Sequence, residues 1–342
     1  MRPTIADKYM KQLFKPEDIE RKVLLILKIL HESQMPMGAR VIARRMSEHD
    51  VQLSERTVRY HLKIMDERGL TQLVGRRDGR IITSQGLAEI SDARVQDKIA
   101  LSISRIDVLS FKTTFDVKKK RGLVPVNISF FPKEQFAQAL KIMKLVFVKN
   151  LAISSRVAVA QAGKTLGDIV VPQGKVGLAT ICSIVINGVF LKYGIPIDSK
   201  FAGILQVKNS IPLRFVELIY YTGSSLDPSE IFIRGNMTSV KQVVAEGEGK
   251  ILANFREIPA LSRSLVDRVI DDLAKVGING VLSIGNIGHP VCQTHVDMNK
   301  IGMILIGGLN PVAAACEEGL DVDNKAMSSV MEFEKMKDVS TL

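Results

Sequence analysis

The stretch from Glu48 to Arg80 constrains the fold of this chain more than any other part of it. Ser54 has the short hydroxyl side chain that caps a helix N-terminus, and Gly69 is the residue type that ends a helix. Apolar side chains recur at helical spacing through this stretch and form a stripe that is expected to be buried. They are Val58, Leu62, Met65 and Leu70. The pattern predicts one amphipathic helix with a defined beginning and end.

The opposite face of this helix is basic and polar. Its side chains supply phosphate-binding charge and base-edge donors at the front of the helix, where a helix-turn-helix protein meets the major groove. These residues are Arg56, Thr57, Arg59, Tyr60 and Lys63. An ordinary solvated helix also carries basic residues, but the hairpin sequence directly after this helix favours a DNA-recognition helix.

Two short β-prone runs form that hairpin sequence, Leu70–Val74 and Arg80–Thr83, joined by GRRDG. This joint predicts a hairpin with Arg76, Arg77 and Arg80 at its tip, suited to a contact with the DNA backbone or minor groove. An ordinary hairpin is the alternative interpretation. The complete order of helix, polar turn, capped basic helix, glycine and basic hairpin indicates a winged helix that binds double-stranded DNA.

Helical periodicity also predicts the rest of this first domain. A first helix is expected at Asp18–Glu32, a short second helix at Ala39–Met46 and a closing helix at Ser84–Arg94. We therefore place a winged-helix DNA-binding domain at residues 1–92 and a connector, which could be helical, at residues 93–112.

The composition agrees with a polyanion partner. The chain of 342 residues has a formal net charge of +11, which strengthens binding to nucleic acid through counterion release. Charge alone does not separate DNA from RNA or an anionic membrane. The sequence has no signal peptide and no apolar run long enough to span a bilayer, and its three cysteines lie far apart. We expect a cytoplasmic protein with reduced thiols and no membrane partner.

From about Phe111 the composition changes to alternating strands and helices. Strands are expected at Leu123–Phe131, Ala202–Val207 and Ile251–Glu257, and an amphipathic helix at Leu261–Val276. The apolar run Gly177–Phe190 is too short to cross a membrane and predicts a buried helix. The fold class is thus an N-terminal α+β winged helix-turn-helix followed by a mixed α/β (α+β) domain at residues 113–323. Residues 324–342 are predicted to be a polar tail that frays.

Two other kinds of site have weaker support in the sequence. His289, Cys292 and His295 have a spacing that suits zinc, but no fourth ligand is evident and strand alternation would separate them. No phosphate-binding glycine loop, nucleophile arrangement or paired carboxylates indicate catalysis. We predict neither a metal site nor an enzyme.

The chain resembles the NrpR family of archaeal repressors of nitrogen-assimilation genes. The resemblance covers about residues 18–320. It rests on ERTVRYHLKIMDERGLT and GRRDGRIIT in the winged helix, and more specifically on GLATICSIVINGVFLKYGIPIDSKFAGILQV and IGMILIGGLNPVAAACEEG. Some family members carry two NrpR domains, whereas this chain has room for one. That departure implies a homodimer or a partner protein with a second NrpR domain.

The resemblance implies that the second domain senses 2-oxoglutarate as an effector, without another cofactor, and that binding releases the repressor from its operator. A keto dicarboxylate needs cationic or backbone N–H donors at two points. Candidates are the polar residues in or near the apolar run and a glycine turn that can form an anion nest. They are Cys182, Ser183, Asn187, Lys192, Lys200, Gly307, Gly308 and Asn310.

Each candidate also has a structural interpretation. Cys182 can be a small core residue, and Gly307 and Gly308 can form only a tight turn. Arg214 and Arg234 are further possible carboxylate clamps, although exposed arginines are more common. The alternative function is a small-molecule-binding protein or metabolic enzyme whose winged helix serves protein contacts.

Overall fold

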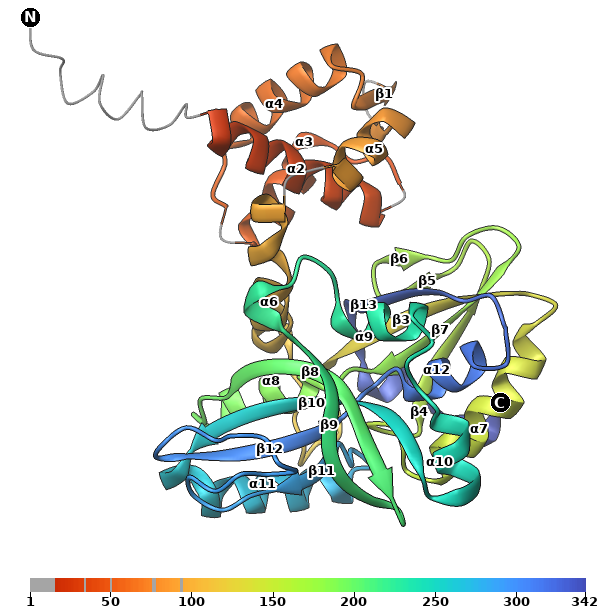
Figure 1. Cartoon of the computed structure of the whole chain (residues 1–342). Helices are drawn as coiled ribbons and strands as arrows, with labels where there is room; N and C mark the ends of the chain where they lie inside the picture. The colour runs from red at the N-terminus through yellow and green to blue at the C-terminus, as the bar shows by residue number, and fades with distance from the viewer. Residues whose placement is uncertain (1–15, 34, 50, 76–77, 93–94) are drawn as a thin grey trace, which may run out of the picture. The chain divides into compact units, whose positions relative to one another are not determined.

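The computed structural model describes residues 16–33, 35–49, 51–75, 78–92 and 95–342 (Figure 1). The chain divides into two compact units, Met1–Lys98 and Ile99–Leu342. Helix α6 (Val95–Lys112) begins in the first unit and ends in the second, so a single helix occupies most of the predicted connector. Among the described residues, no helix is both long enough and apolar enough to cross a membrane.

The first unit has the winged-helix order that the sequence predicts. Its apolar residues include Leu27 on the first helix, Ile42 on the second and Leu62 on the third, and all three are fully buried. The two strands form an antiparallel hairpin after the third helix. The elements are α2 (Pro16–Ser33), α3 (Ala39–Ser47), α4 (Glu55–Glu67), β1 (Thr71–Gly75), β2 (Gly79–Ile82) and α5 (Ser84–Asp92).

The second unit contains two five-stranded antiparallel sheets. The first sheet has the order β11 (Val281–Ile284), β12 (Lys300–Ile306), β10 (Gly249–Pro259), β8 (Asp198–Lys208) and β9 (Ile211–Tyr220). The second sheet has the order β13 (Asp323–Glu332), β3 (Leu123–Pro132), β7 (Lys175–Ile181), β4 (Arg156–Gln161) and β14 (Lys337–Asp338). A small hairpin, β5 (Thr165–Leu166) and β6 (Ile169–Val170), lies outside both sheets.

Helices pack on these sheets through apolar faces. Figure 1 shows α11 along one face of the first sheet, where Val266, Val269 and Leu273 enter the core. In α7, Met143 and Val146 are buried in a second cluster, with residues of α12. The helices of this unit are α7 (Phe136–Val148), α8 (Ile184–Lys192), α9 (Pro228–Arg234), α10 (Val240–Glu246), α11 (Arg263–Lys275) and α12 (Asn310–Cys316).

The second unit is built from two halves that repeat one order of elements. The first half contains β3, α7, β4, β7, α8 and β8, and the second contains β10, α11, β11, β12, α12 and β13. The same offset in residue number relates Lys175 to Lys300 and Asp198 to Asp323, the residues at which four of these strands begin. This internal repeat was not predicted from the sequence.

The two halves exchange their last strands. Strand β8 follows α8 of the first half but pairs with β10 of the second, with Ala202 opposite Asn254. Strand β13 follows α12 of the second half but pairs with β3 of the first, with Asn324 opposite Ser129. Each sheet therefore contains strands from both halves, so the two halves form one folding unit.

The prediction of a buried helix over Gly177–Phe190 is wrong in its first part. Residues to Ile181 belong to β7, and α8 begins only at Ile184. Strand β7 lies between β3 and β4 and is buried on both faces, so its sequence shows no alternation of polar and apolar residues. Hydrophobic periodicity cannot distinguish such a strand from a buried helix.

The prediction of a fraying polar tail at residues 324–342 is also wrong. Strand β13 pairs with β3 over most of its length, and Phe333, Met336 and Val339 are almost fully buried beyond it. Each of these three apolar residues stands among polar neighbours, so the composition of the segment looks polar. Their burial makes the segment part of the second unit.

Candidate functional site

Helix α4 has the termini and the buried stripe that its sequence predicts. The Ser54 hydroxyl accepts a hydrogen bond from the backbone N–H of Thr57 at 3.1 Å, and Gly69 adopts a left-handed φ of 71°. Val58, Leu62 and Met65 are fully buried. This packing fixes which face of the helix is turned to solvent.

The solvent face of α4 carries the predicted DNA-binding residues. Arg56, Arg59, Tyr60 and Lys63 are exposed. Thr57 is half-buried, and its hydroxyl lies 2.8 Å from that of Ser54. Thr57 therefore contributes to the helix cap, whereas the other four side chains are available to a ligand.

An acidic residue organises the basic groups at the start of α4. The Glu55 carboxylate is paired with Arg59 on the next turn and with Arg40 on α3. Desolvation, which acts in the opposite direction, is outweighed by these two arginines, and the pKa of Glu55 is lowered. Glu55 thus stays ionised and holds Arg59 in place on an exposed surface.

The structure corrects the placement of Arg80. Instead of lying at the hairpin tip, Arg80 is within β2, and its backbone exchanges two hydrogen bonds with Met37. Its Nε atom lies 2.7 Å from Oδ2 of Asp66 on α4, and the same carboxylate accepts the Thr71 hydroxyl at 2.6 Å. Arg80 therefore fixes the wing to the recognition helix. Arg76 and Arg77 lie outside the described residues.

A small cavity lies between the two halves of the second unit, with open space of about 20 Å³. This is room for about one water molecule, so a larger ligand requires the side chains of the wall to move. Asn127 and Asn254 are equivalent in the repeat, because each lies five residues before the proline that ends its strand, Pro132 of β3 and Pro259 of β10, and both line the cavity. Ser183 and Gly308, which precede α8 and α12, are a second equivalent pair in its wall.

Arg256 breaks this symmetry. It lines the cavity from β10, is 1% exposed, and has Ser129 as its equivalent on β3. Among the described residues, none forms a hydrogen bond with its Nε or Nη1 atom. Its guanidinium carbon lies 5.3 Å from the centre of the Tyr221 ring. Because buried donors without an acceptor are costly, these two nitrogen atoms are suited to an anion that enters the cavity.

The polar groups around Arg256 form hydrogen bonds with one another. The Tyr221 hydroxyl donates to Oδ1 of Asn254 at 2.5 Å, and Nδ2 of Asn254 donates to the Ser183 hydroxyl at 3.3 Å. Asp227 also lines the cavity, but its carboxylate caps α9 by accepting the backbone N–H groups of Ser229 and Glu230. The cavity therefore offers a fixed set of donors and acceptors.

Three of the predicted effector residues line this cavity, namely Cys182, Ser183 and Gly308. Burial raises the pKa of Cys182 to about 11, so its side chain is a neutral thiol. Cys182 is also part of an apolar cluster, which agrees with its interpretation as a small core residue.

The other predicted effector residues have partners outside the cavity wall. Asn187 donates to the Ser199 hydroxyl at 3.0 Å, and Nζ of Lys192 donates to the carbonyl of Phe115 at 3.0 Å. Gly307 and Asn310 both bond to the backbone of Leu252. These four residues stabilise the fold around the site.

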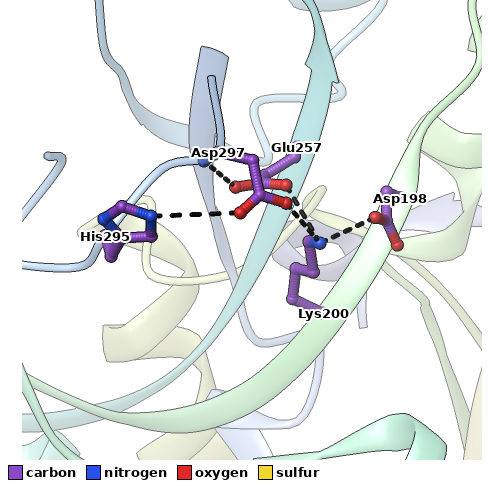
Figure 2. A network of polar contacts seen from close by, with 5 residues as sticks. All are labelled: Asp198, Lys200, Glu257, His295 and Asp297. Atoms are coloured by element: carbon purple, nitrogen blue, oxygen red, sulfur yellow. Dashed lines mark hydrogen bonds and ion pairs between the residues drawn. The ribbon is translucent and has the colours of Figure 1, made fainter. Parts of the chain in front are cut away.

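Lys200 lies in a network of carboxylates, which Figure 2 shows. Its Nζ atom is 2.9 Å from Asp198, 3.1 Å from Glu257 and 3.1 Å from Asp297. Glu257 is 2% exposed, and Lys200 provides the cation that its burial requires. A lysine already paired with three carboxylates is not available to bind an effector carboxylate.

The three residues with a zinc-like spacing do not gather into a metal-ligand group among the described residues. His289 and His295 are exposed, and the Cys292 thiol points to the carbonyl of Pro212 at 3.6 Å. In the part of the chain that the structure describes, no group of three or more histidine, cysteine or acidic side chains could hold a metal ion.

Known proteins match both units of the chain. Residues 99–338 match a family model described as NrpR regulatory domains NRD1 and 2, and residues 24–90 match the ribonuclease R winged-helix domain. A global nitrogen regulator, NrpRI, from Methanosarcina mazei is 37% identical over 94% of this chain and 98% of its own length. The chain belongs to the NrpR family.

Two further relatives are longer than this chain. Global nitrogen regulators NrpR from Methanocaldococcus jannaschii and Methanococcus maripaludis are 32% and 30% identical to this chain, which spans only 55% and 54% of their lengths. A crystal structure of a nitrogen repressor-like protein from Methanococcus jannaschii matches with a TM-score of 0.60 and 28% identity, over 70% of this chain and 98% of that one. The predicted NrpR resemblance is thus confirmed, and the named relatives are regulators.

Among the cavity residues of this NrpR chain that were not predicted from the sequence are Arg256, Asn127, Tyr221 and Asn254. One signal was available, because Arg256 is a charged residue in the strand sequence ILANFREIP, which is otherwise mostly apolar. A charge in a fully buried strand needs a partner or a ligand. Asn127 and Tyr221 carry no such local signal.

Proposed function

We propose that this chain is a DNA-binding repressor of nitrogen-assimilation genes, released from its operator by 2-oxoglutarate. The named relatives, which are global nitrogen regulators, support the biological role. The exposed basic face of α4, which stands beside the wing, supports binding to the major groove. The observation that carries the effector half of the proposal is Arg256, a buried guanidinium without a partner for Nε and Nη1 among the described residues.

Operator recognition is assigned to the front of α4. Arg59 and Tyr60 are exposed there and are positioned to reach base edges, with Arg56 and Lys63 beside them for phosphates. Glu55 holds Arg59 until DNA binds, when a base edge or phosphate replaces the carboxylate. Binding to a promoter fragment should show a steep salt dependence.

Effector recognition is assigned to the cavity. Arg256 accepts one carboxylate in a charge-assisted pair, and the Ser183 hydroxyl and Asn127 amide supply further polar contacts. The neutral thiol of Cys182 fills space beside them. A dicarboxylate with a keto group uses more of these donors than a monocarboxylate does, which gives selectivity for 2-oxoglutarate.

Calorimetric titration of the full chain with 2-oxoglutarate tests this assignment. Wild type should release or absorb heat with saturation, the Arg256→Met variant should not, and the Arg214→Ala variant should behave as wild type. Arg214 is the matched control because it is exposed and bonds to Gln206 outside the cavity. Absence of heat at millimolar ligand from folded wild type, or equal binding by Arg256→Met, would refute the effector site.

We also propose that the repressor acts as a homodimer or with a second NrpR-domain protein. One winged helix covers one half-site, and two-fold symmetry supplies both affinity and spacing. Sedimentation of the chain with and without promoter DNA measures its oligomeric state. A monomer that binds the operator with full affinity would contradict this part of the proposal.

A further inference from the structure

The connector helix α6 forms part of the cavity's surroundings. Ile106 and Leu109 on α6 are 1% and 5% exposed, and they pack in one apolar cluster with Cys182, Tyr221 and Met327. These last three residues also line the cavity. The helix that continues from the winged-helix unit is thus in contact with the side chains that an effector would touch.

Met327 joins the cavity to the connector through its backbone. Its N–H donates to Oδ1 of Asn127 in the cavity wall at 3.0 Å, and its carbonyl accepts from Nε of Arg105 on α6 at 2.5 Å. Nη2 of Arg105 also donates to the carbonyl of Ser328 at 3.1 Å. One arginine of the connector therefore holds two successive carbonyl groups of β13.

The segment that Arg105 holds is an irregular one. Pairing between β13 and β3 is interrupted between Lys325 and Ser329, and Met327 adopts a left-handed φ of 49° while 6% exposed. This conformation is unfavourable for a residue with a side chain and persists only where its surroundings impose it. Here the hydrogen bonds of Asn127 to the Met327 N–H and of Arg105 to the Met327 carbonyl fix this backbone conformation.

The equivalent strand of the other half is irregular at a different residue. Ala202 is the equivalent of Met327 in the repeat, and it pairs with Asn254 between the flanking pairs of Phe201 and Gly203, whereas the register of β8 shifts at Lys200. Ala202 also lies in the apolar cluster that contains Ile106 and Leu109. Strand β13 differs in that two of its carbonyl groups accept hydrogen bonds from Arg105 of α6.

We propose that Arg105 is a positioning residue that transmits occupancy of the cavity to the winged helix. This inference rests on the proposed function. An effector carboxylate bound by Arg256 competes with Oδ1 of Asn127 for the Met327 N–H, the opened segment of β13 relaxes, and Arg105 loses its two carbonyl acceptors. Helix α6, which continues into the winged-helix unit, then loses this anchor, and operator affinity falls. The opened segment is the two-state element that such coupling needs.

The test measures coupling separately from binding. Operator affinity, with a promoter fragment, is measured with and without 2-oxoglutarate for wild type, Arg105→Ala, Arg105→Lys and the control Arg268→Ala, an exposed arginine on α11. Wild type and the control should show a ratio of about 5- to 150-fold, as is typical of allosteric coupling. In Arg105→Ala the ratio should fall below about 2-fold while calorimetric affinity for 2-oxoglutarate stays within about 3-fold. Arg105→Lys, which keeps one donor, should give an intermediate ratio.

Hydrogen exchange without any effector provides the second readout. In Arg105→Ala the amides of residues 326–328 should exchange faster than in wild type, and those of residues 103–112 should follow. Unchanged exchange in both segments, or an Arg105→Ala variant with the wild-type coupling ratio, would overturn the inference. If wild type itself fails to bind 2-oxoglutarate, the proposed function fails, and the exchange comparison still decides the role of Arg105. Arg105→Gln carries the same expectations if the alanine variant does not fold.

Discussion

Arg80 in the winged helix and Arg256 in the second unit illustrate two ways in which a protein accommodates a guanidinium. The Arg80 side chain is 22% exposed and has a carboxylate partner, Asp66, at 2.7 Å. Arg256 is 1% exposed, and its Nε and Nη1 atoms have no partner among the described residues. A guanidinium that is paired with a carboxylate is already occupied, whereas buried guanidinium nitrogens without an acceptor are available to a ligand.

The largest expected effect follows from replacing Arg256, the buried member of this pair of arginines. In Arg256→Met an apolar side chain of similar length replaces the guanidinium, so affinity for 2-oxoglutarate should fall about 100-fold or more, since hydrogen bonds to charged groups contribute about 1.5–3 kcal/mol each. The ligand-free variant should be as stable as wild type or more stable by about 1–4 kcal/mol. Calorimetry measures both quantities. A large loss of stability without ligand would mean that Arg256 has a partner within the fold.

The next effect concerns Asp66. Asp66→Ala removes the acceptor of both Arg80 and Thr71, and should destabilise the winged-helix unit by about 2–3 kcal/mol. Affinity for operator and for random DNA should fall together, because the wing loses its position while the base-reading residues remain. Urea unfolding and mobility shifts test this. Asp78→Ala, at an exposed residue in the hairpin joint, is the control and should have little effect.

A third prediction uses a carboxyl group near the cavity. Burial, followed by the charge of Asp227, raises the pKa of Glu230 to about 7, and its Oε1 accepts the backbone N–H of Ala326 at 2.7 Å. The unfolded carboxyl ionises near 4.5, so it loses its proton before the folded one does. The protonated Glu230 carboxyl therefore stabilises the folded state fully below about pH 4.5. This stabilisation is lost as the pH rises toward 7.

Glu230→Gln keeps the acceptor and removes the titration. Between pH 5 and pH 8 the free energy of unfolding of wild type should fall by about 1–2 kcal/mol more than that of Glu230→Gln. Thermal unfolding at both pH values measures the difference, with the exposed Glu248→Gln as the control. Parallel pH profiles for wild type and Glu230→Gln would show that Glu230 is ionised throughout.

The smallest effect separates two residues on the face of α4. Arg59→Ala should lower operator affinity about 10-fold and random-DNA affinity less, as expected for a base contact. Lys63→Ala should weaken both about equally and reduce the salt slope by roughly one. An equal loss of operator and random-DNA affinity in Arg59→Ala would move base recognition to another residue.

The sequence predicted the local features and missed the long-range ones. Helix α4 could be predicted because its cap at Ser54, its apolar stripe and its terminal Gly69 all lie within one short stretch. Helices α9 and α10 were not predicted, because seven residues each are too few for a clear periodicity.

The cavity depends on contacts between distant segments. The cavity is lined by Asn127 on β3, Ser183 before α8 and Arg256 on β10. These residues come close together because the two halves exchange β8 and β13. Cys182, Ser183 and Gly308 were predicted because the family resemblance pointed to their segments. Lys200 was placed wrongly because the carboxylates that neutralise it, Glu257 and Asp297, are far away in sequence.

One buried side chain has a consequence for the chemical lifetime of the protein. Asn310 is fully buried, and its amide completes the hydrogen bonding of β10 by accepting the Leu252 N–H at 2.8 Å and donating to the Leu252 carbonyl at 3.1 Å. Conversion of this amide to a carboxylate by deamidation would remove the donor and bury a charge. The next residue is Pro311, whose nitrogen carries no hydrogen and cannot close the succinimide ring through which asparagine usually deamidates. Asn310, where deamidation would disrupt the sheet, is therefore protected from it by the residue that follows.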